Sequence, residues 1–338
     1  MNETLIGMLI LVAAAAMNGS FTLPMKFTKE WNWENTWLAW TIFALILFPP
    51  VLAALVIPRM LDVYAGGSAT IIKVALFGAG WGIAQVLFGL AVDAIGIALT
   101  FSIVLGLSAA VGSLLPLFQL HADRVNTPGG RGIMVGVFVV LTGVSLCAIA
   151  GRKREAATQA AAGSVERLYG KGLASALLCG FGAAFVNFGL AYGRPLIDSA
   201  RSFGATAVWA PHAAWLPVML AGAVPNLLYC VYLMRKNHSA GQYARSGTLF
   251  YWVLAAAMAL LWFASTQLYG IASERLGSLG PVLGWPSFMS LIVITANVWS
   301  IATGEWKNAG KDSLRFMFAG VAALLLAVFV IGYAGRSL

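Results

Sequence analysis

Ten apolar runs, each about as long as a helix that crosses a bilayer, constrain this chain more than any other feature of its sequence. A membrane-spanning helix needs about 20 mostly apolar residues. Inside lipid the backbone must satisfy its own polar groups, so such runs form helices. The sequence therefore predicts an all-α integral membrane protein with ten transmembrane helices. The runs cover residues 4–25, 37–57, 71–92, 98–120, 132–150, 170–192, 208–234, 248–272, 280–303 and 314–334.

The composition agrees with this class. Of the 338 residues, 60% are hydrophobic and only 10% are charged, whereas a soluble chain has about 25% charged residues. That is too little polar surface to cover a water-soluble protein. No Lys or Arg precedes the first apolar run, and a secretory signal needs a basic segment there. We therefore expect the first run to be a membrane helix.

The basic residues are distributed unevenly over the loops. The loops after the first, third, fifth, seventh and ninth runs (the odd-numbered loops) hold thirteen Lys and Arg, and the even-numbered loops with the termini hold eight. Cytoplasmic loops carry the excess of Lys and Arg. This predicts cytoplasmic odd-numbered loops and both termini on the outer side. The net charge of +9 is spread over many short loops, which indicates no nucleic-acid partner.

One segment occurs twice in the chain. "WGIAQVLFGLAVDAIG" (81–96) and "WFASTQLYGIASERLG" (262–277) align when the first is shifted by 181 residues. General hydrophobicity does not force a Trp, two Gly and an acid into register, so the match indicates a duplication. The aligned pairs include Trp81 with Trp262, Gly89 with Gly270, Asp93 with Glu274, and Gly96 with Gly277.

The duplication divides the ten runs into two halves of five. Because five is odd, the second half must enter the membrane from the opposite side, which makes an inverted repeat. We expect a first five-helix repeat at 1–150, a polar cytoplasmic linker at 151–169 and a second five-helix repeat at 170–338. Inverted repeats are typical of secondary transporters, whose substrate site lies near the midplane between the halves.

An enzyme and a channel are the competing classes. None of the three histidines pairs with another His or a Cys at ligand spacing, and the cysteines show no metal-binding pattern. No nucleophile elbow, zinc-protease helix or phosphate-binding loop occurs. The sequence therefore indicates neither an enzyme nor a metal or organic cofactor.

Neutral amides inside the apolar runs are candidates for binding substrate. Polar groups in a bilayer are costly and tend to face a cavity, and an amide both donates and accepts hydrogen bonds. Aromatic rings accompany them, and indole faces with amides suit a neutral polyol. The alternatives are that the amides join helices and that the Trp side chains are interfacial anchors. The substrate-binding candidates are Asn18, Trp81, Gln85, Asn187, Asn226, Gln267 and Trp285.

Trp285 lies in "GPVLGWPSFM", where Gly and Pro residues predict an interruption at the start of a span. Broken helices often occur at transporter sites, although a proline can also simply bend a helix.

Four titratable side chains are candidates for exchanging a proton. Burial can raise the pKa of a carboxyl group, and histidine titrates near neutral pH. The alternatives are that the acids mark the membrane boundary, where Arg275 is available to pair with Glu274, and that His212 is a packed histidine or lies at a helix end. The proton-coupling candidates are Glu34, Asp93, Glu274 and His212.

Four segments spread over both halves resemble the L-rhamnose–proton symporter family of the drug/metabolite transporter superfamily. They are "LPMKFTKEWNWENTW" (23–37), "FGAGWGIAQVLFGL" (77–90), "AGAVPNLLYCVYLMRK" (221–236) and "GEWKNAG" (304–310). The resemblance implies two five-helix halves in the bacterial inner membrane, where the termini predicted on the outer side would be periplasmic. It implies import of L-rhamnose or a related deoxyhexose with a proton as coupling ion, by alternating access. "WFASTQLYG" departs from the more aromatic family pattern, which leaves the exact sugar open.

The resemblance also assigns roles to residues in its motifs. Lys26, Trp33 and Glu305 are expected to gate or support the structure, and Glu34 to titrate or to pair with Lys26. The expected partners are a small sugar and the lipid bilayer. The oligomeric state stays open, and a monomer is compatible with the sequence. The alternative functions are a uniporter or exporter of another small metabolite, and a membrane sensor or scaffold that transports nothing.

Overall fold

The computed structural model describes residues 3–95, 97–159, 169–307 and 309–335, and this part of the chain contains helices and no strands. Four short helical elements lie beside the α-helices: η1 (Leu23–Phe27), η2 (Ile42–Leu47), η3 (Ala122–Arg124) and η4 (Ala240–Ala244). The α-helices are α1 (Glu3–Ser20), α2 (Trp33–Thr41), α3 (Phe48–Val56), α4 (Met60–Ala65), α5 (Ser68–Ile95), α6 (Ile97–Leu120), α7 (Pro128–Gln159), α8 (Tyr169–Ala183), α9 (Phe185–Tyr192), α10 (Arg194–Ser202), α11 (His212–Lys236), α12 (Leu249–Arg275), α13 (Gly280–Ala302) and α14 (Lys311–Ala334).

Within the described residues, ten helical segments are long and apolar enough to cross a membrane, which confirms the ten predicted spans. The second span begins at Trp33, a turn before the apolar run. Helix α7 continues to Gln159, into the segment expected as a linker. Residues 160–168 of that segment lie outside the described residues.

Two spans are interrupted within the membrane. The second span changes from α2 to the π-helical η2 and then to α3, just before Pro49 and Pro50. Proline has no N–H to donate, so a helix must adjust around it. The sixth span is divided into α8, α9 and α10, and Pro195 occupies the first turn of α10.

The ninth span differs from expectation, because α13 is continuous from Gly280 to Ala302 and the interruption expected near Trp285 is absent. Pro281 lies in the first turn, where a missing N–H does no harm. Pro286 removes the helical donor to the carbonyl of Val282. The Ser113 hydroxyl of α6 donates to that carbonyl at 2.7 Å instead.

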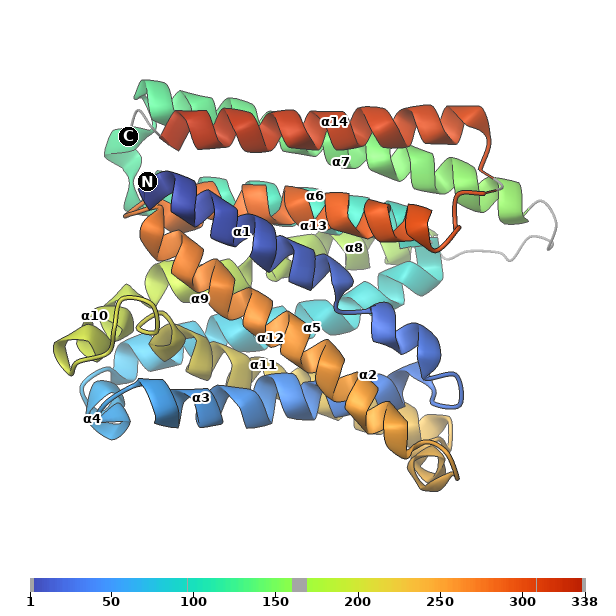
Figure 1. Ribbon diagram of the computed structural model, residues 1–338, viewed down its shortest axis with the longest axis horizontal. Coiled ribbons are helices and arrows are strands. Elements are labelled where there is room, and N and C mark those ends of the chain that lie inside the picture. Colours follow the sequence, from blue (N-terminus) through green and yellow to red (C-terminus); the bar gives the residue numbers. More distant parts are fainter. Residues whose placement is uncertain (1–2, 96, 160–168, 308, 336–338) are drawn as a thin grey trace.

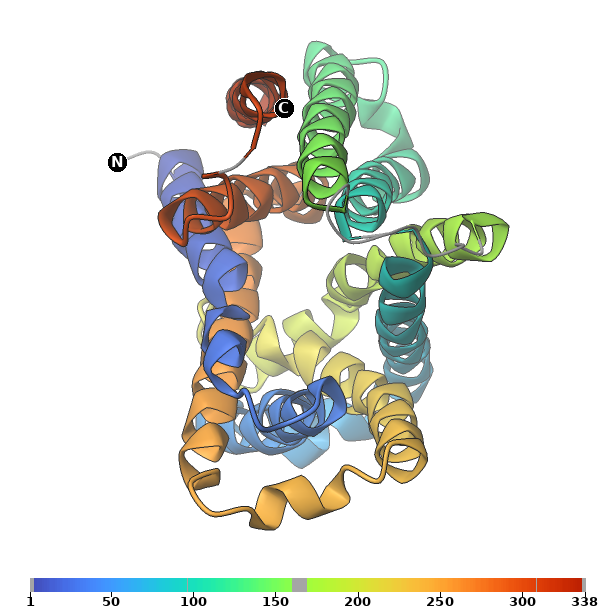
Figure 2. The same cartoon turned by 90° about the vertical axis from the view of Figure 1, so that its right-hand side faces the viewer.

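The helix packing fits an inverted repeat. In the first half, α5 (the third span) packs against α8 and α9 (the sixth) and against α11 (the seventh). In the second half, α12 (the eighth span) packs against α1 (the first) and against α2 and η2 (the second). Exchanging the halves turns the third span into the eighth, the sixth into the first and the seventh into the second. The two sets of contacts therefore correspond to each other. Figure 2 shows the spans surrounding a common centre.

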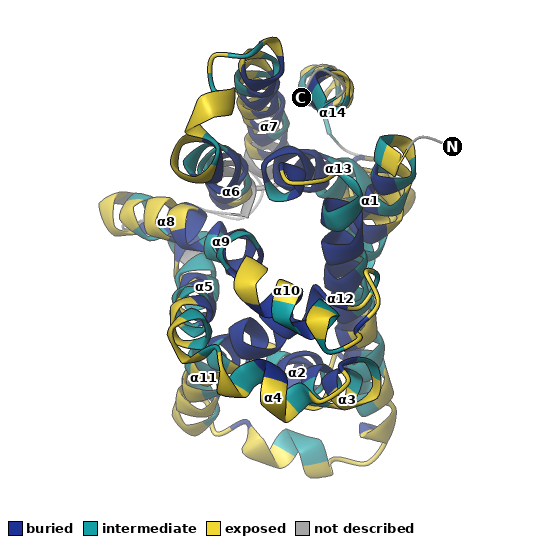
Figure 3. Ribbon diagram, turned by 90° about the vertical axis from the view of Figure 1, so that its left-hand side faces the viewer, coloured by how far each residue is buried: buried dark blue, intermediate teal, exposed yellow. Residues whose placement is uncertain are grey.

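The fifth and tenth spans, α7 and α14, run side by side at one edge of the molecule, and both termini lie at the same end (Figure 1). Figure 3 shows α10 crossing in front of the centre at that end, between α9 and α12. Large apolar side chains such as Leu55, Phe138 and Phe329 are exposed on the outside. An apolar exterior is what a lipid environment requires.

Candidate functional site

A cavity of about 130 Å³ lies between the two halves of the chain. Helices α1, α5 and α6 of the first half and α8, α9, α11, α12 and α13 of the second contribute to its wall. The wall is mainly aromatic, with a few small polar side chains. The lining residues are Asn18, Trp81, Leu105, Ser108, Ala183, Val186, Trp215, Trp262, Thr266, Tyr269, Trp285, Phe288 and Met289.

Two tryptophans that are counterparts in the sequence repeat meet at this cavity. The rings of Trp81 on α5 and Trp262 on α12 stack with their centroids 5.5 Å apart and an interplanar angle of 18°. Such offset stacking is a favourable arrangement of aromatic rings. The duplicated segment therefore places one indole from each half at the interface between the halves.

A second aromatic group forms another part of the wall. Tyr269 stacks on Phe288 at 4.9 Å and meets the edge of Trp285 at 5.4 Å. The Trp285 indole N–H donates to the backbone carbonyl of Ser108 at 2.9 Å, and the Tyr269 hydroxyl donates to the Asn187 side chain. These hydrogen bonds fix the polar edges of the rings and leave their faces for apolar contact.

The cavity wall also contains polar atoms without partners. The Ser108 hydroxyl and the Trp215 indole nitrogen are buried, and neither has a hydrogen-bond partner in the described structure. Buried polar groups are nearly always paired, so an unpaired one needs an explanation. Asn18 donates to the Ser265 hydroxyl at 3.1 Å from its place in the wall. Aromatic faces with a few unpaired polar groups suit a small neutral molecule that carries hydroxyl groups.

The predicted substrate residues divide into two sets. Asn18, Trp81 and Trp285 line the cavity. Asn187 and Asn226 are buried between helices. Asn187 donates to the carbonyls of Gly112 and Pro281, and Asn226 accepts from the Trp37 indole at 3.0 Å.

The two glutamines lie elsewhere. Gln267 is buried against His212 rather than in the cavity wall. Gln85, one turn from Trp81 on α5, is partly exposed and does not belong to the cavity lining. Their assignment to the substrate site stays a prediction.

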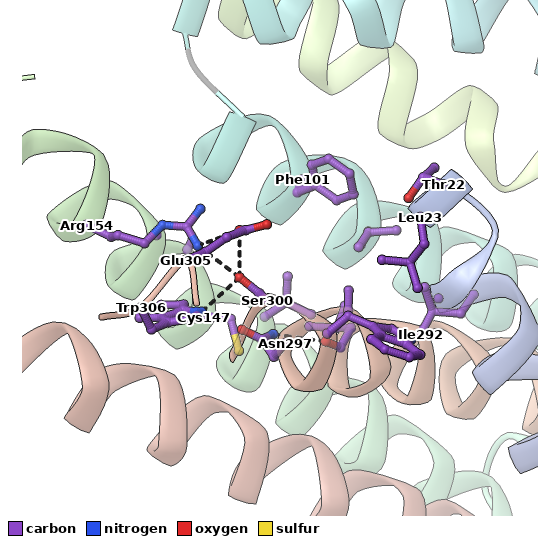
Figure 4. Close-up of a pocket in the computed structure, with 18 of the residues that line it drawn as sticks. Thr22, Leu23, Phe101, Cys147, Arg154, Ile292, Asn297, Ser300, Glu305 and Trp306 are labelled. Atoms are coloured by element: carbon purple, nitrogen blue, oxygen red, sulfur yellow. Dashed lines mark hydrogen bonds and ion pairs between the residues drawn. The ribbon is translucent and has the colours of Figure 1, made fainter. Parts of the chain in front are cut away.

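A larger vestibule of about 300 Å³ opens on the face of the odd-numbered loops. Leu105 lines both the vestibule and the central cavity, so one side chain belongs to both walls. Figure 4 shows Arg154, Ser300 and Glu305 gathered at one end of the vestibule, with Thr22 and Leu23 at the other. The vestibule and the cavity are therefore neighbouring spaces with Leu105 between them.

Glu305 joins three elements at that end of the vestibule. Its carboxylate accepts from Lys26 of η1 at 2.9 Å, from Arg154 of α7 at 3.1 Å and from Ser300 of α13 at 2.7 Å. Partial burial acts to raise the pKa of Glu305, but the hydrogen bonds and positive charges of these partners outweigh it and hold the pKa below its ordinary value. The expected pairing of Lys26 with Glu34 is wrong, because Lys26 pairs with Glu305.

Glu34 instead accepts three hydrogen bonds from neutral side chains. Asn32, Asn237 and Ser239 donate to its Oε1 at 3.1, 3.0 and 2.7 Å. The last two lie after α11, so Glu34 anchors the start of the second span to the loop between the seventh and eighth spans. Trp33 stacks on Trp37 at 5.2 Å beside it.

The opposite face is held by arginine–carboxylate pairs. Glu274 at the end of α12 binds Arg194 at 3.1 Å and also Arg201, both of α10. The expected pairing of Glu274 with Arg275 is wrong. Successive side chains on a helix point in different directions, and Arg275 pairs with Glu3 of α1 at 2.6 Å. The Asp93 side chain lies outside the described residues.

Residues 1–337 of the 338 match the family described as "L-rhamnose-proton symport protein (RhaT)". The chain belongs to this symporter family. It is similar to the L-rhamnose-proton symporters of Escherichia coli and Citrobacter koseri, at 27% identity, and of Yersinia pestis, at 28%. Each alignment covers 98% of this chain and 98% of the relative. The chain is thus a multi-pass membrane protein of a transporter family.

Sequence reasoning noted Trp215, Trp262 and Tyr269 as aromatic rings that accompany the amides but left them out of the substrate-binding candidates, and it did not name the cavity residues Ser108, Thr266, Phe288 and Met289. The repeat contained a usable signal for two of them. Trp262 and Tyr269 stand opposite Trp81 and Phe88 in the aligned segments. Choosing the counterpart of Trp81 would have added Trp262 to the substrate-binding candidates.

Proposed function

We propose that this chain imports L-rhamnose or a related deoxyhexose together with a proton, by alternating access. Family membership and the named relatives support the sugar and the proton. The observation that carries the proposal is the aromatic cavity between the halves, where Trp81 and Trp262 stack and Ser108 has an unpaired hydroxyl. A deoxyhexose offers C–H faces to the indoles and hydroxyl groups to the unpaired polar atoms.

The two faces of the molecule differ, and this difference supports one conformational state of the proposed transporter. The cavity shares Leu105 with the vestibule, while the pocket beside Glu274 on the other face shares no lining residue with the cavity. The Lys and Arg distribution supports cytoplasmic odd-numbered loops and periplasmic termini. On this orientation the structure is an inward-facing state in the bacterial inner membrane. Exchange of conformation between the two halves opens the other face.

One chain contains every helix that lines the cavity, so a monomer suffices for the transport that we propose. A uniporter for the same sugar is the second candidate, because the cavity by itself requires no proton. Internal pH distinguishes the two.

The test uses purified protein in liposomes that contain a pH-sensitive dye, with no imposed gradient. L-Rhamnose added outside is expected to acidify the interior, and L-fucose, L-lyxose and D-mannose to do so less. Uptake of labelled rhamnose without acidification would establish a uniporter. Acidification by another sugar alone would keep the mechanism and change the substrate.

The cavity has its own test. Trp262→Ala is expected to weaken rhamnose binding at least about tenfold, because the ligand loses an aromatic surface and Trp81 loses its stacking partner. Trp209→Ala, in the exposed segment between α10 and α11, is the matched control and is expected to bind normally. Binding is measured by displacement of labelled rhamnose from the purified protein. Equal affinities in the two variants would refute the assignment of this cavity.

A further inference from the structure

His212 is a buried titratable side chain that lies outside the aromatic cavity. It begins α11 and is 1% exposed. Both ring nitrogens lie 2.8 Å from an oxygen, Nδ1 from the Gln267 Oε1 and Nε2 from the backbone carbonyl of Pro49. We propose that His212, held between Pro49 and Gln267, is the site that binds the transported proton. This assignment rests on the proposed proton-coupled function.

The two neighbours restrict the hydrogens on the ring. A backbone carbonyl only accepts, so Nε2 carries a hydrogen in every state that keeps the bond to Pro49. In the neutral ring Nδ1 has a lone pair and needs a donor. In the protonated ring Nδ1–H needs an acceptor. The partner of Nδ1 therefore has to change its role when the proton arrives.

Gln267 meets this requirement because its amide has both an oxygen and an NH₂ group. With its oxygen toward Nδ1, as in this structure, Gln267 accepts from the protonated ring, and its Nε2 atom is then buried without a partner. After rotation by about 180°, the NH₂ group donates to the neutral ring. The site thus has two fully bonded ring states that differ by one proton and one amide rotation.

Apolar and neutral side chains surround the ring in the part of the chain that the structure describes. The Phe263 ring lies 5.9 Å away, edge to face, and the Tyr64 hydroxyl of α4 donates to the carbonyl of Ala213 at 3.0 Å. Among the described residues, no acidic or basic side chain forms a hydrogen bond or an ion pair with His212. A buried cation without a counter-ion is costly, so proton binding depends on the two oxygens that face the ring.

Two other proton-coupling candidates, Glu34 and Glu274, and also the vestibule carboxylate Glu305 have fixed partners, while the Asp93 side chain lies outside the described residues. Glu34 accepts three neutral donors, Glu274 binds Arg194 and Arg201, and Glu305 binds Lys26 and Arg154. Protonation of Glu274 or Glu305 would remove the negative charge that pairs with these cations, and protonation of Glu34 would weaken the three hydrogen bonds that it accepts. His212 can gain a proton without losing a bond.

The position of His212 couples the proton to the sugar. Pro49 belongs to the first half, whereas His212 and Gln267 belong to the second, so relative movement of the halves removes one acceptor. Trp215 lies one turn after His212 on α11, and Thr266 precedes Gln267 on α12; both line the cavity. Movement of one half relative to the other, or binding of the sugar in the cavity, therefore changes the affinity of His212 for the proton.

The first experiment compares rhamnose-driven acidification with sugar counterflow in liposomes. His212→Gln is expected to lose the acidification while still exchanging labelled for unlabelled rhamnose. His121→Gln, the same substitution in the loop after α6, is the matched control and is expected to acidify like the wild type. Acidification at the wild-type rate by His212→Gln would overturn the proposal and leave the symport function intact. Rhamnose uptake without acidification by the wild type would instead refute symport itself.

A second measurement leaves the site unaltered and decides the case if His212→Gln fails to fold. The chain with His121→Gln and His238→Gln keeps His212 as its only histidine. Its ring carries ¹⁵N label, and NMR in detergent follows the ring from about pH 5 to about pH 9. The expected result is a change from an Nε2–H tautomer to a doubly protonated ring, with a midpoint that moves when rhamnose is added. A ring that keeps one protonation state throughout, with and without rhamnose, would overturn the proposal.

Discussion

The indole of Trp215 packs against Gly270 at the edge of the cavity. A Cβ added at Gly270 would lie 2.7 Å from the indole nitrogen, which is closer than such contacts occur. Gly89 is the counterpart of Gly270 in the sequence repeat, and a Cβ there meets nothing within 4 Å. Gly270 is needed for the close approach of the Trp215 indole, whereas nothing packs closely against Gly89, although the repeat aligns the two glycines.

Gly270→Ala is expected to displace Trp215, to weaken rhamnose binding and to lower the free energy of unfolding by about 1–3 kcal/mol, as overpacking does. Gly89→Ala is expected to be neutral or to stabilise by up to about 1 kcal/mol, because alanine favours a helix. Thermal unfolding in detergent and rhamnose titration of tryptophan fluorescence measure both. Equal effects at the two glycines would contradict this account of the wall.

At the scale of the elements, three of the four prolines that lie past the first turn of α6, α11 and α13 share one arrangement, in which the proline deprives a carbonyl four residues earlier of its helical donor. In lipid such a carbonyl has no water to pair with. A side chain from another element donates to each one. The prolines are Pro116, Pro217 and Pro286, and the donors are Asn187 to Gly112 at 2.8 Å, Tyr64 to Ala213 at 3.0 Å and Ser113 to Val282 at 2.7 Å.

A double-mutant cycle tests this pairing. Ser113→Ala is expected to lower the free energy of unfolding by about 1–3 kcal/mol, because the Val282 carbonyl is left buried and unpaired. Pro286→Ala restores an N–H that bonds this carbonyl within α13. In that background we expect Ser113→Ala to have a much smaller effect. Thermal unfolding measures all four proteins, and strictly additive effects would show that the serine does not replace the missing donor.

Glu305 ties η1, α7 and α13 together, and its lowered pKa predicts how this link depends on pH. A carboxyl with a folded-state pKa below its unfolded value stabilises the fold above the unfolded pKa of about 4.3 and loses this contribution as the pH falls through the folded pKa. Glu305 is 39% exposed, so screening reduces the contribution to about 1 kcal/mol or less.

Glu305→Gln is therefore expected to be slightly less stable than the wild type near neutral pH and to match it in stronger acid. Asp62→Asn, in the exposed pair with Arg59, is the control and should change stability little at any pH. Melting temperatures in detergent across the acid range measure both. A difference between Glu305→Gln and the wild type that grows as the pH falls would contradict the assigned charge state.

At the scale of the whole molecule, the vestibule and the pocket beside Glu274 lie on opposite faces. Leu105 lies in the walls of both the vestibule and the cavity, whereas the arginines of α10 pair with Glu274 on the other face. The proposed function interprets this difference as one of the two end states of alternating access, with the orientation expected from the distribution of Lys and Arg.

Thiol labelling with a membrane-impermeant reagent tests both the state and the orientation. In a Cys147→Ala background, Asn297→Cys in the vestibule is expected to react from the cytoplasmic side, in inverted vesicles. Ala207→Cys, in the pocket on the opposite face, is expected to react in intact cells. The reverse sidedness would overturn the orientation. Reaction of Asn297→Cys from both sides would contradict a closed opposite face.

The sequence by itself determined the number of spans, the helical class and the duplication. These follow from the length of apolar runs and from residue identities, which are local properties of the chain. It also indicated Asn18, Trp81 and Trp285, which do line the cavity. The family followed from sequence as well, since its motifs lie in both halves.

Only the tertiary structure decided which polar groups face the cavity and which join helices. Lipid is as apolar as the protein interior, so hydrophobic periodicity does not distinguish the outer face of a span from its inner face. Asn187 and Asn226 hold helices together, while Trp215 lines the cavity. The pairing of Lys26 with Glu305 and of His212 with Pro49 joins residues far apart in the chain. The rotation and packing of complete helices bring them together, and no local pattern records that arrangement.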